Sequence, residues 1–138
     1  MINRLIWMVG LFILPSKFYI YSQGINLVPN YSFEEKSDCP NYYTQFNLLY
    51  NWFKPVLGTS PDYYNSCWTG IPENNGSVPQ NIAGFQQAHD GEGYIGICLD
   101  LIYLQFISKN YREYISVKLK ENLKQCIKYN LTFYVSLA

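Results

Sequence analysis

The amino-acid sequence predicts an all-β sandwich, because strand-like segments alternate with turn residues and no long amphipathic helix is evident. The two clearest segments are Tyr111–Leu119 and Tyr129–Leu137, in which residues of the two faces alternate with a period of two. This period places apolar side chains on one side of a strand and polar side chains on the other. Short segments of this kind, separated by glycine, proline and asparagine, are typical of β-sandwiches.

Composition narrows the class of protein. The chain has 138 residues, which suffices for one domain with its own core. Hydrophobic residues make up 49% and charged residues 14%, which excludes a disordered tail. Fourteen residues are tyrosines, which favour half-buried sheet surfaces and amphipathic contact sites.

The charge balance excludes nucleic acid as a partner. The whole chain has ten basic and ten acidic residues. Removing residues 1–22 takes away Arg4 and Lys17, so eight basic residues remain against ten acidic ones, a net charge of about −2. Such a chain has no basic surface for a phosphate backbone.

The first 22 residues resemble a secretory signal peptide. Within Met1–Ser22, Arg4 supplies the positive start, Leu5–Leu14 is apolar, and cleavage is expected before Gln23. The apolar run is shorter than the about 20 residues that span a bilayer. The alternative is an uncleaved anchor that continues through residues 18–21. We expect an exported mature chain without a transmembrane span.

The first ordered strand is expected at Asn26–Glu35, directly behind this signal. Pro29 cannot donate a hydrogen bond to a sheet, which places it at an edge or a bulge. Phe33 is the one large apolar anchor of this stretch, and the apolar run Phe46–Phe53 follows. Trp52, near the end of that run, is expected in the core.

The middle of the chain is rich in turn signals. Gly58–Asn65 and Thr69–Gln80 contain the proline, asparagine and glycine residues of loops. Short strands are expected at Asn81–Gln86 and Tyr94–Leu99. Asp100–Asn110 fits either a buried strand or a short helix, and periodicity does not decide between them.

Tyr129–Leu137 has the pattern of a core strand and lies at the end of the sequence. A central strand has neighbours on both sides, and a hydrophobic edge strand invites aggregation. We therefore expect residues 23–138 to be the N-terminal part of a sandwich domain in a longer polypeptide.

The four cysteines are Cys39, Cys67, Cys98 and Cys126. They allow three pairings, and sequence alone does not choose among them. Cys39–Cys67 is the preferred disulfide, because both residues lie in turn-rich segments of an exported chain. The spacings and the single histidine do not match a zinc site.

Eight short motifs occur along the chain. They are Asn-Leu-Val-Pro-Asn-x-Ser-Phe-Glu-Glu (26–35), Ser-x-Cys-Pro (37–40), Trp-Phe-x-Pro (52–55), Pro-Asp-Tyr-Tyr-Asn-Ser-Cys (61–67), Gly-Phe-Gln (84–86), Gly-x-Gly-Tyr-Ile-Gly-Ile (91–97), Arg-Glu-Tyr-Ile-x-Val-Lys-Leu (112–119) and Phe-Tyr-Val-Ser-Leu-Ala (133–138). As a set, they resemble the N-terminal domain of exported cell-surface proteins of the Bacteroidetes. Such domains often precede an OmpA-like domain or a type IX secretion sorting domain.

The resemblance implies a galactose-binding-like jelly roll, similar to many carbohydrate-binding modules, at the cell surface, in the outer membrane or outside the cell. It also implies a structural calcium, for which Glu34 and Asp90 are the matching carboxylates. The alternative is that both are solvated surface residues.

Aromatic residues in loops indicate a binding site. Tyr63, Tyr64 and Trp68 are candidates to stack on a sugar ring, with Asn65 and Gln86 as polar neighbours. The alternative is that these rings fill the core or cover its loop ends. The favoured ligand class is therefore carbohydrate or glycan.

Catalysis is not predicted for this chain. No two acidic residues have a recognisable catalytic spacing, and His89 lies beside Asp90 in a turn. The leading function is a non-catalytic binding module of the cell envelope. The alternatives are a structural envelope domain without a small ligand and, less favoured, an accessory domain of a larger secreted hydrolase.

Overall fold

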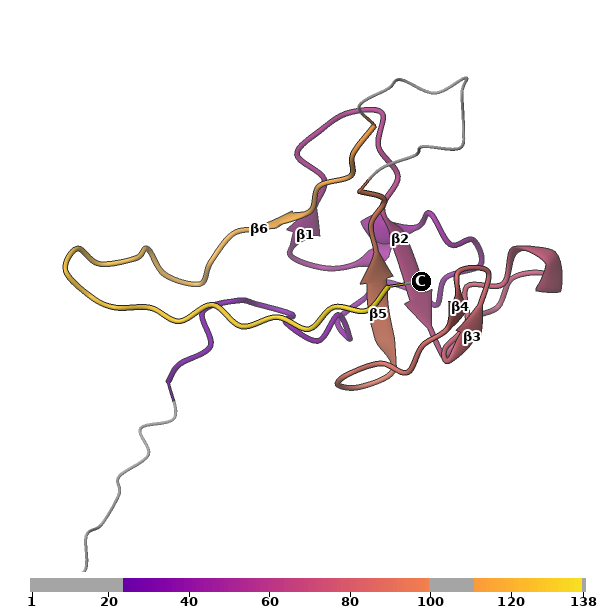
Figure 1. Ribbon diagram of the computed structural model, residues 1–138, viewed down its shortest axis with the longest axis horizontal. Helices are drawn as coiled ribbons and strands as arrows, with labels where there is room; N and C mark the ends of the chain where they lie inside the picture. Colours follow the sequence, from indigo (N-terminus) through magenta and orange to yellow (C-terminus); the bar gives the residue numbers. More distant parts are fainter. Residues whose placement is uncertain (1–23, 100–110, 138) are drawn as a thin grey trace, which may run out of the picture.

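A computed structural model describes residues 24–99 and 111–137 (Figure 1). The signal segment Met1–Ser22 and the ambiguous segment Asp100–Asn110 lie outside the described residues. Within the described ranges, no helix is long and apolar enough to cross a membrane.

The described residues form an all-β arrangement of short strands, as the sequence predicts. Two 3₁₀ turns and six strands are present, with no α-helix in the described part of the chain. The strands pair antiparallel into three two-stranded ladders, β1–β6, β2–β5 and β3–β4. In chain order the elements are η1 (Phe46–Leu48), β1 (Trp52–Phe53), β2 (Asp62–Asn65), η2 (Pro72–Asn74), β3 (Gln80–Asn81), β4 (Gly84–Phe85), β5 (Gly93–Gly96) and β6 (Ser116–Val117).

The longest ladder joins β2 to β5. Tyr63 lies opposite Ile95, and Tyr64 lies opposite Tyr94 with ring centroids 5.2 Å apart. Adjacent aromatic residues favour a pleated surface and cross-strand pairing. The expectation that all of Gly58–Asn65 is a turn region is therefore wrong for its last four residues.

The core lies where this ladder meets the 3₁₀ turn η1. Phe46, Leu49 and Tyr63 form the buried cluster. Four partly buried side chains pack around it, from residues Phe33, Trp52, Ile95 and Ile115. Phe33 thus anchors its segment and Trp52 packs against the core, as the sequence predicts.

The expected first strand, Asn26–Glu35, is a turn instead. Asn30 has a φ angle of 45°, and its side-chain amide bonds both the N–H and the carbonyl of Glu35 at 2.9 and 2.8 Å. The same amide donates to the carbonyl of Tyr50 at 2.9 Å. Asparagine tolerates this conformation and satisfies the backbone locally, so it closes a loop where alternation predicted extended chain.

The C-terminal strands also differ from expectation. Only Ser116–Val117 of Tyr111–Leu119 pairs as a strand, with Phe53 and Trp52 opposite. Tyr129–Leu137 pairs with no described strand, and Leu131 and Val135 are 81% and 83% exposed. The prediction that it is a core strand is wrong for this structure. Alternation specifies the two faces of a strand, but hydrogen bonding requires a neighbour.

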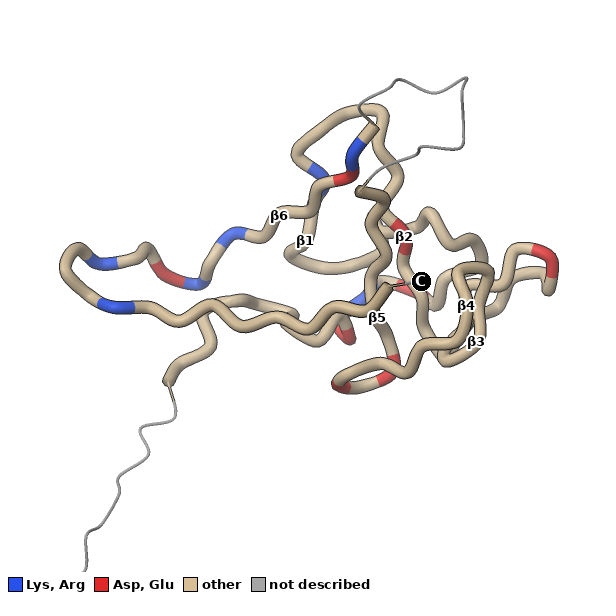
Figure 2. Tube along the Cα trace, in the orientation of Figure 1, with Lys and Arg blue, Asp and Glu red and all other residues tan. Residues whose placement is uncertain are grey.

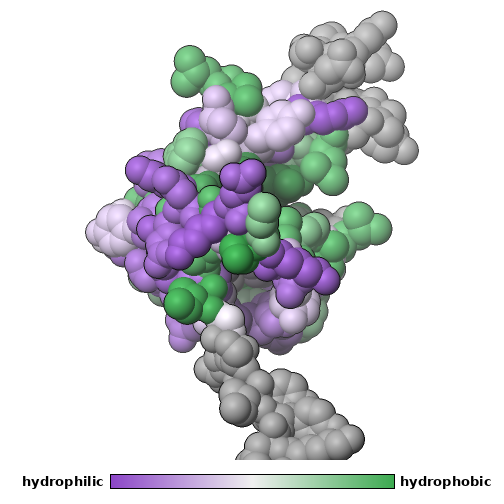
Figure 3. Space-filling view, turned by 90° about the vertical axis from the view of Figure 1, so that its left-hand side faces the viewer, coloured by the Kyte–Doolittle hydropathy of each residue, from purple (hydrophilic) through white to green (hydrophobic). Residues whose placement is uncertain are grey.

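Residues 118–137, called the arm below, extend from β6 and return toward the body (Figure 1). Lys120 holds the arm to the N-terminal segment through bonds to the carbonyls of Leu27 and Asn26, at 2.9 and 3.2 Å. His89 stacks on Tyr134 with centroids 3.4 Å apart. Lysines are spread along the arm (Figure 2), and hydrophobic side chains are exposed among hydrophilic ones on this side of the molecule (Figure 3).

The disulfide prediction is confirmed. Cys39 and Cys67 are bonded, with Cα atoms 5.5 Å apart and a separation of 28 residues. Cys98 is a half-buried thiol and Cys126 an exposed one. The disulfide joins the loop before η1 to the turn that follows β2, and it indicates an oxidising environment.

Candidate functional site

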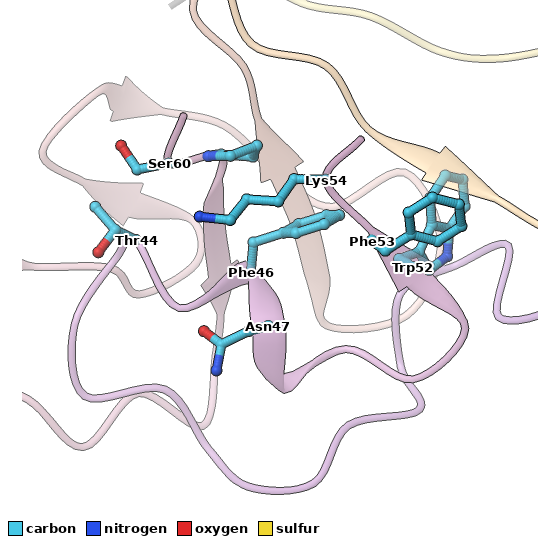
Figure 4. A pocket seen from close by; sticks show the side chains of 8 residues that line it. Thr44, Phe46, Asn47, Trp52, Phe53, Lys54 and Ser60 are labelled. Atoms are coloured by element: carbon cyan, nitrogen blue, oxygen red, sulfur yellow. The ribbon is translucent and has the colours of Figure 1, made fainter. Parts of the chain in front are cut away.

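A pocket of about 240 Å³ opens beside the start of β2 (Figure 4). This volume is slightly below the roughly 300–1,000 Å³ typical of ligand pockets, so it suits one sugar ring rather than a large ligand. Its walls come from η1, β1 and the segments that precede η1 and β2. The lining residues are Thr44, Phe46, Asn47, Trp52, Phe53, Lys54, Ser60 and Pro61.

Aromatic rings form one side of the pocket. Phe46 is buried, and Phe53 is 51% exposed on β1. Trp52 is half-buried, packs on Phe33 with centroids 5.0 Å apart, and donates its indole N–H to the carbonyl of Asn30 at 2.9 Å. These contacts hold one indole in place and leave the neighbouring phenyl ring open to solvent.

Polar residues form most of the rest of the lining. Lys54 donates from Nζ to the carbonyl of Thr59 at 2.7 Å, and Thr59 donates from Oγ1 to the carbonyl of Val56 at 3.0 Å. These bonds close the loop between β1 and β2. Asn47 and Ser60 also line the pocket, and the Ser60 hydroxyl, which donates to Glu113 at 3.5 Å, keeps its capacity to accept a hydrogen bond.

Glu113 positions the Ser60 end of the pocket. This carboxylate is only 5% exposed and accepts hydrogen bonds from the Ser60 N–H at 3.0 Å and the Tyr111 hydroxyl at 2.7 Å. Its second oxygen accepts from the Cys98 N–H at 2.8 Å. A buried carboxylate is stable when donors surround it in this way. Glu113 therefore joins its own segment to those of Ser60 and Cys98, which lie 53 and 15 residues away in the sequence.

Asp62 lies at the start of β2, next to the pocket wall. Burial raises its pKa to about 6, and the nearby Glu113 charge adds to the rise, whereas the hydrogen bond from the Tyr64 hydroxyl at 2.9 Å opposes it. Raised carboxyl pKa values occur at acid–base sites and in structural networks alike. Neither Asp62 nor Glu113 is among the residues that line the pocket.

The sequence-predicted residues of β2 lie in the core. Tyr63 and Asn65 are fully buried, and Tyr64 is 2% exposed. The Tyr63 hydroxyl donates to the carbonyl of Phe33 at 2.9 Å and accepts from the Asn65 side chain at 2.9 Å. Burial raises the pKa of both tyrosines. These side chains have no surface to offer a ligand and instead hold β2 in place.

Trp68 and Gln86 lie outside the pocket lining. Trp68 is half-buried, and its indole packs so closely on Gly70 and Gly76 that a Cβ at either glycine would collide with it. Gln86 is exposed and donates to the carbonyl of Gln87 at 2.8 Å. The structure therefore brings Tyr63, Tyr64 and Asn65 together, but it does not join Trp68 or Gln86 to the pocket.

The residues that sequence reasoning missed are Phe53, Lys54 and Ser60. The sequence signal was the aromatic–lysine cluster Trp52–Lys54, which stands at the end of an apolar run. Ser60 is brought into the same pocket by the loop that Lys54 closes and by Glu113. Contacts between residues so far apart in the sequence cannot be predicted from the alternation of apolar and polar residues.

The predicted calcium residues lie around one turn. Oε1 of Glu34 accepts hydrogen bonds from the N–H groups of Glu92 and Gly93 at 2.8 and 2.9 Å, next to Asp90 in sequence. The described ranges contain no group of three or more acidic, histidine or cysteine side chains able to hold a metal ion. Calcium takes six to eight oxygen ligands and accepts backbone carbonyls among them, so calcium binding at Glu34 and Asp90 stays a prediction.

Comparison with protein-family models, curated proteins and solved structures found no match for this chain. The resemblance to Bacteroidetes cell-surface domains therefore rests on the sequence motifs alone and stays a prediction.

Proposed function

We propose that this chain is a non-catalytic binding module of the cell surface, and that its pocket holds a sugar unit of a glycan. One observation carries the proposal: Phe53, whose side chain is 51% exposed, lines the same cavity as Ser60, Asn47 and Lys54. A sugar ring has one apolar face and a rim of hydroxyl groups, so it needs both kinds of wall.

Several side chains that line the pocket are held in place by hydrogen bonds, and this supports the proposal. Lys54 and Ser60 are held by hydrogen bonds to Thr59 and Glu113, and Trp52 is held by Asn30. Groups that are already fixed lose little conformational entropy when a ligand binds. A cavity of about 240 Å³ with fixed polar groups suits a small ligand better than a broad protein interface.

The proposal includes export to the cell surface and a jelly-roll sandwich as the complete fold. The Cys39–Cys67 disulfide and the signal-like segment Met1–Ser22 support export to the cell surface. A jelly-roll sandwich is supported by the antiparallel ladders and by the alternation in Tyr129–Leu137, which would join a sheet when a strand pairs with it.

A structural envelope domain is the second candidate, and the exposed arm favours it. Leu131, Phe133 and Val135 are each more than two-thirds exposed, and they share one face of an extended segment. Exposed apolar rows of this kind mark interaction sites. In this case the chain would bind envelope proteins through the arm and would ignore sugars.

The proposed function is tested by comparing Phe53→Ala with Phe85→Ala in the full chain. Both phenylalanines are largely exposed on two-residue strands, but only Phe53 lines the pocket. We expect a glycan array and calorimetry to show glycan binding that Phe53→Ala weakens at least tenfold and Phe85→Ala leaves unchanged. Absence of binding to any glycan, or equal losses in both variants, would refute the pocket as a sugar site.

A further inference from the structure

Lys54 is the one charged residue among the described side chains that line the pocket. The other lining residues are aromatic, hydroxyl-bearing, amide or proline residues. The pocket therefore presents a cation to its ligand without an acidic side chain in the same wall.

The ammonium group of Lys54 uses only part of its hydrogen-bonding capacity in the described structure. It has three N–H donors, and one of them reaches the Thr59 carbonyl at 2.7 Å. Within the described part of the chain no second acceptor is bonded to Nζ. Figure 4 shows the Lys54 side chain extending between Ser60 and Phe46. The remaining donors are therefore available to an acceptor in the cavity.

The buried carboxylate of Glu113 is bonded to groups other than this cation. Glu113 binds Ser60, Tyr111 and Cys98, so donors from three other residues surround its two oxygens. Glu113 forms no hydrogen bond with Lys54 in the described structure. Charge-assisted hydrogen bonds are stronger than neutral ones, so a ligand carboxylate would gain more from Lys54 than a hydroxyl would.

We infer that the pocket selects an acidic sugar, whose carboxylate binds Nζ of Lys54 while its ring lies against Phe53. The inference rests on the proposed function, because it names the substrate class of the same pocket. A uronic acid differs from the matching neutral sugar only in a carboxylate that replaces the terminal hydroxymethyl group. This pair of ligands therefore isolates the contribution of the lysine.

The test titrates the full chain with methyl glucuronide and methyl glucoside, and with the corresponding galacturonide and galactoside. Binding is followed by calorimetry and by NMR at low and high salt. We expect at least one acidic sugar to bind roughly tenfold more tightly than its neutral partner, consistent with a charge-assisted hydrogen bond. Salt should reduce this difference, because it screens exposed charges.

Lys54→Met keeps most of the side-chain length and removes the charge, so it should abolish the preference for the acid. Lys54→Arg should retain part of it, and Lys124→Met, on the exposed arm, serves as the matched control. Equal affinity for acidic and neutral sugars would overturn the inference and leave the proposed function standing. If no sugar in either pair binds, the inference fails, and the glycan array with Phe53→Ala decides the proposed function separately.

Discussion

The Glu34 carboxylate accepts a hydrogen bond from the backbone N–H of Gly93 at 2.9 Å, across 59 residues of sequence. The same oxygen accepts from the N–H of Glu92 at 2.8 Å. Gly91, in the same turn, has a φ angle of 72°, and a Cβ there would lie 2.5 Å from the Glu34 carboxyl. Glu34 thus fastens the turn before β5 to the N-terminal loop.

We predict that Glu34→Ala lowers the free energy of unfolding by about 2 kcal/mol, because two backbone donors lose a charged acceptor. Glu35→Ala is the control, since Glu35 is adjacent and exposed. Chemical denaturation of the two variants measures the difference. Equal stability of both variants would show that the Glu34 contacts do not hold the turn.

Removal of the disulfide should destabilise the protein more than removal of a free thiol. Cys39 and Cys67 close a loop across 28 residues, for which the chain-entropy model gives about 3–4 kcal/mol. The variant Cys39→Ser with Cys67→Ser should therefore melt well below the wild-type chain. Cys126→Ser, at an exposed cysteine, should melt close to it. Thermal melting followed by circular dichroism would contradict this if the two variants behave alike.

Asp62 should make stability depend on pH between about 4 and 6. Its pKa is about 6 in the folded chain and near 3.8 when unperturbed, so the folded state keeps a proton that the unfolded state releases. Stability therefore falls as pH rises through this window, and it levels off above about pH 6. Asp62 is partly exposed, and solvent screening makes the loss smaller than full burial would.

Asp62→Asn removes this proton linkage and keeps an acceptor for the Tyr64 hydroxyl. We predict that the variant gains stability relative to the wild-type chain as pH rises from 4 to 6. Melting temperatures at several pH values test this, with Asp90→Asn as an exposed control. A gain for the wild-type chain over the same window would contradict the burial of Asp62.

The arm should contribute little to stability. Val135 is 83% exposed, so Val135→Ser should change the free energy of unfolding by no more than about 0.5 kcal/mol. Leu49 is 4% exposed in the core, and Leu49→Ala should cost about 2–5 kcal/mol. A loss of several kcal/mol in Val135→Ser would mean that the arm is packed as a core strand.

The sequence predicted features that depend on local chemistry. The disulfide followed from two turn-rich segments, and the anchoring by Phe33 followed from a single large apolar residue in its loop. The strand near Tyr94 followed from its alternation, although β5 ends at Gly96. These features depend mainly on residues that are close together in the sequence.

Other features depend on partners that lie far away in the chain. Asp62–Asn65 is a strand because β5 pairs with it. The same pairing places its two tyrosines in the core. Conversely, Tyr129–Leu137 kept its alternation but has no described partner. The pocket depends on Glu113, which holds Ser60 from 53 residues away. Residue patterns do not specify such pairings.

The most direct test of the account is to follow the indole N–H signals of Trp52 and Trp68 by NMR during titration of the full chain with acidic sugar. Trp52 lines the pocket and Trp68 does not. We predict that the Trp52 signal shifts in a saturable way and that the Trp68 signal stays in place. A shift of Trp68 alone, or of neither indole, would contradict the claim that this pocket binds an acidic sugar.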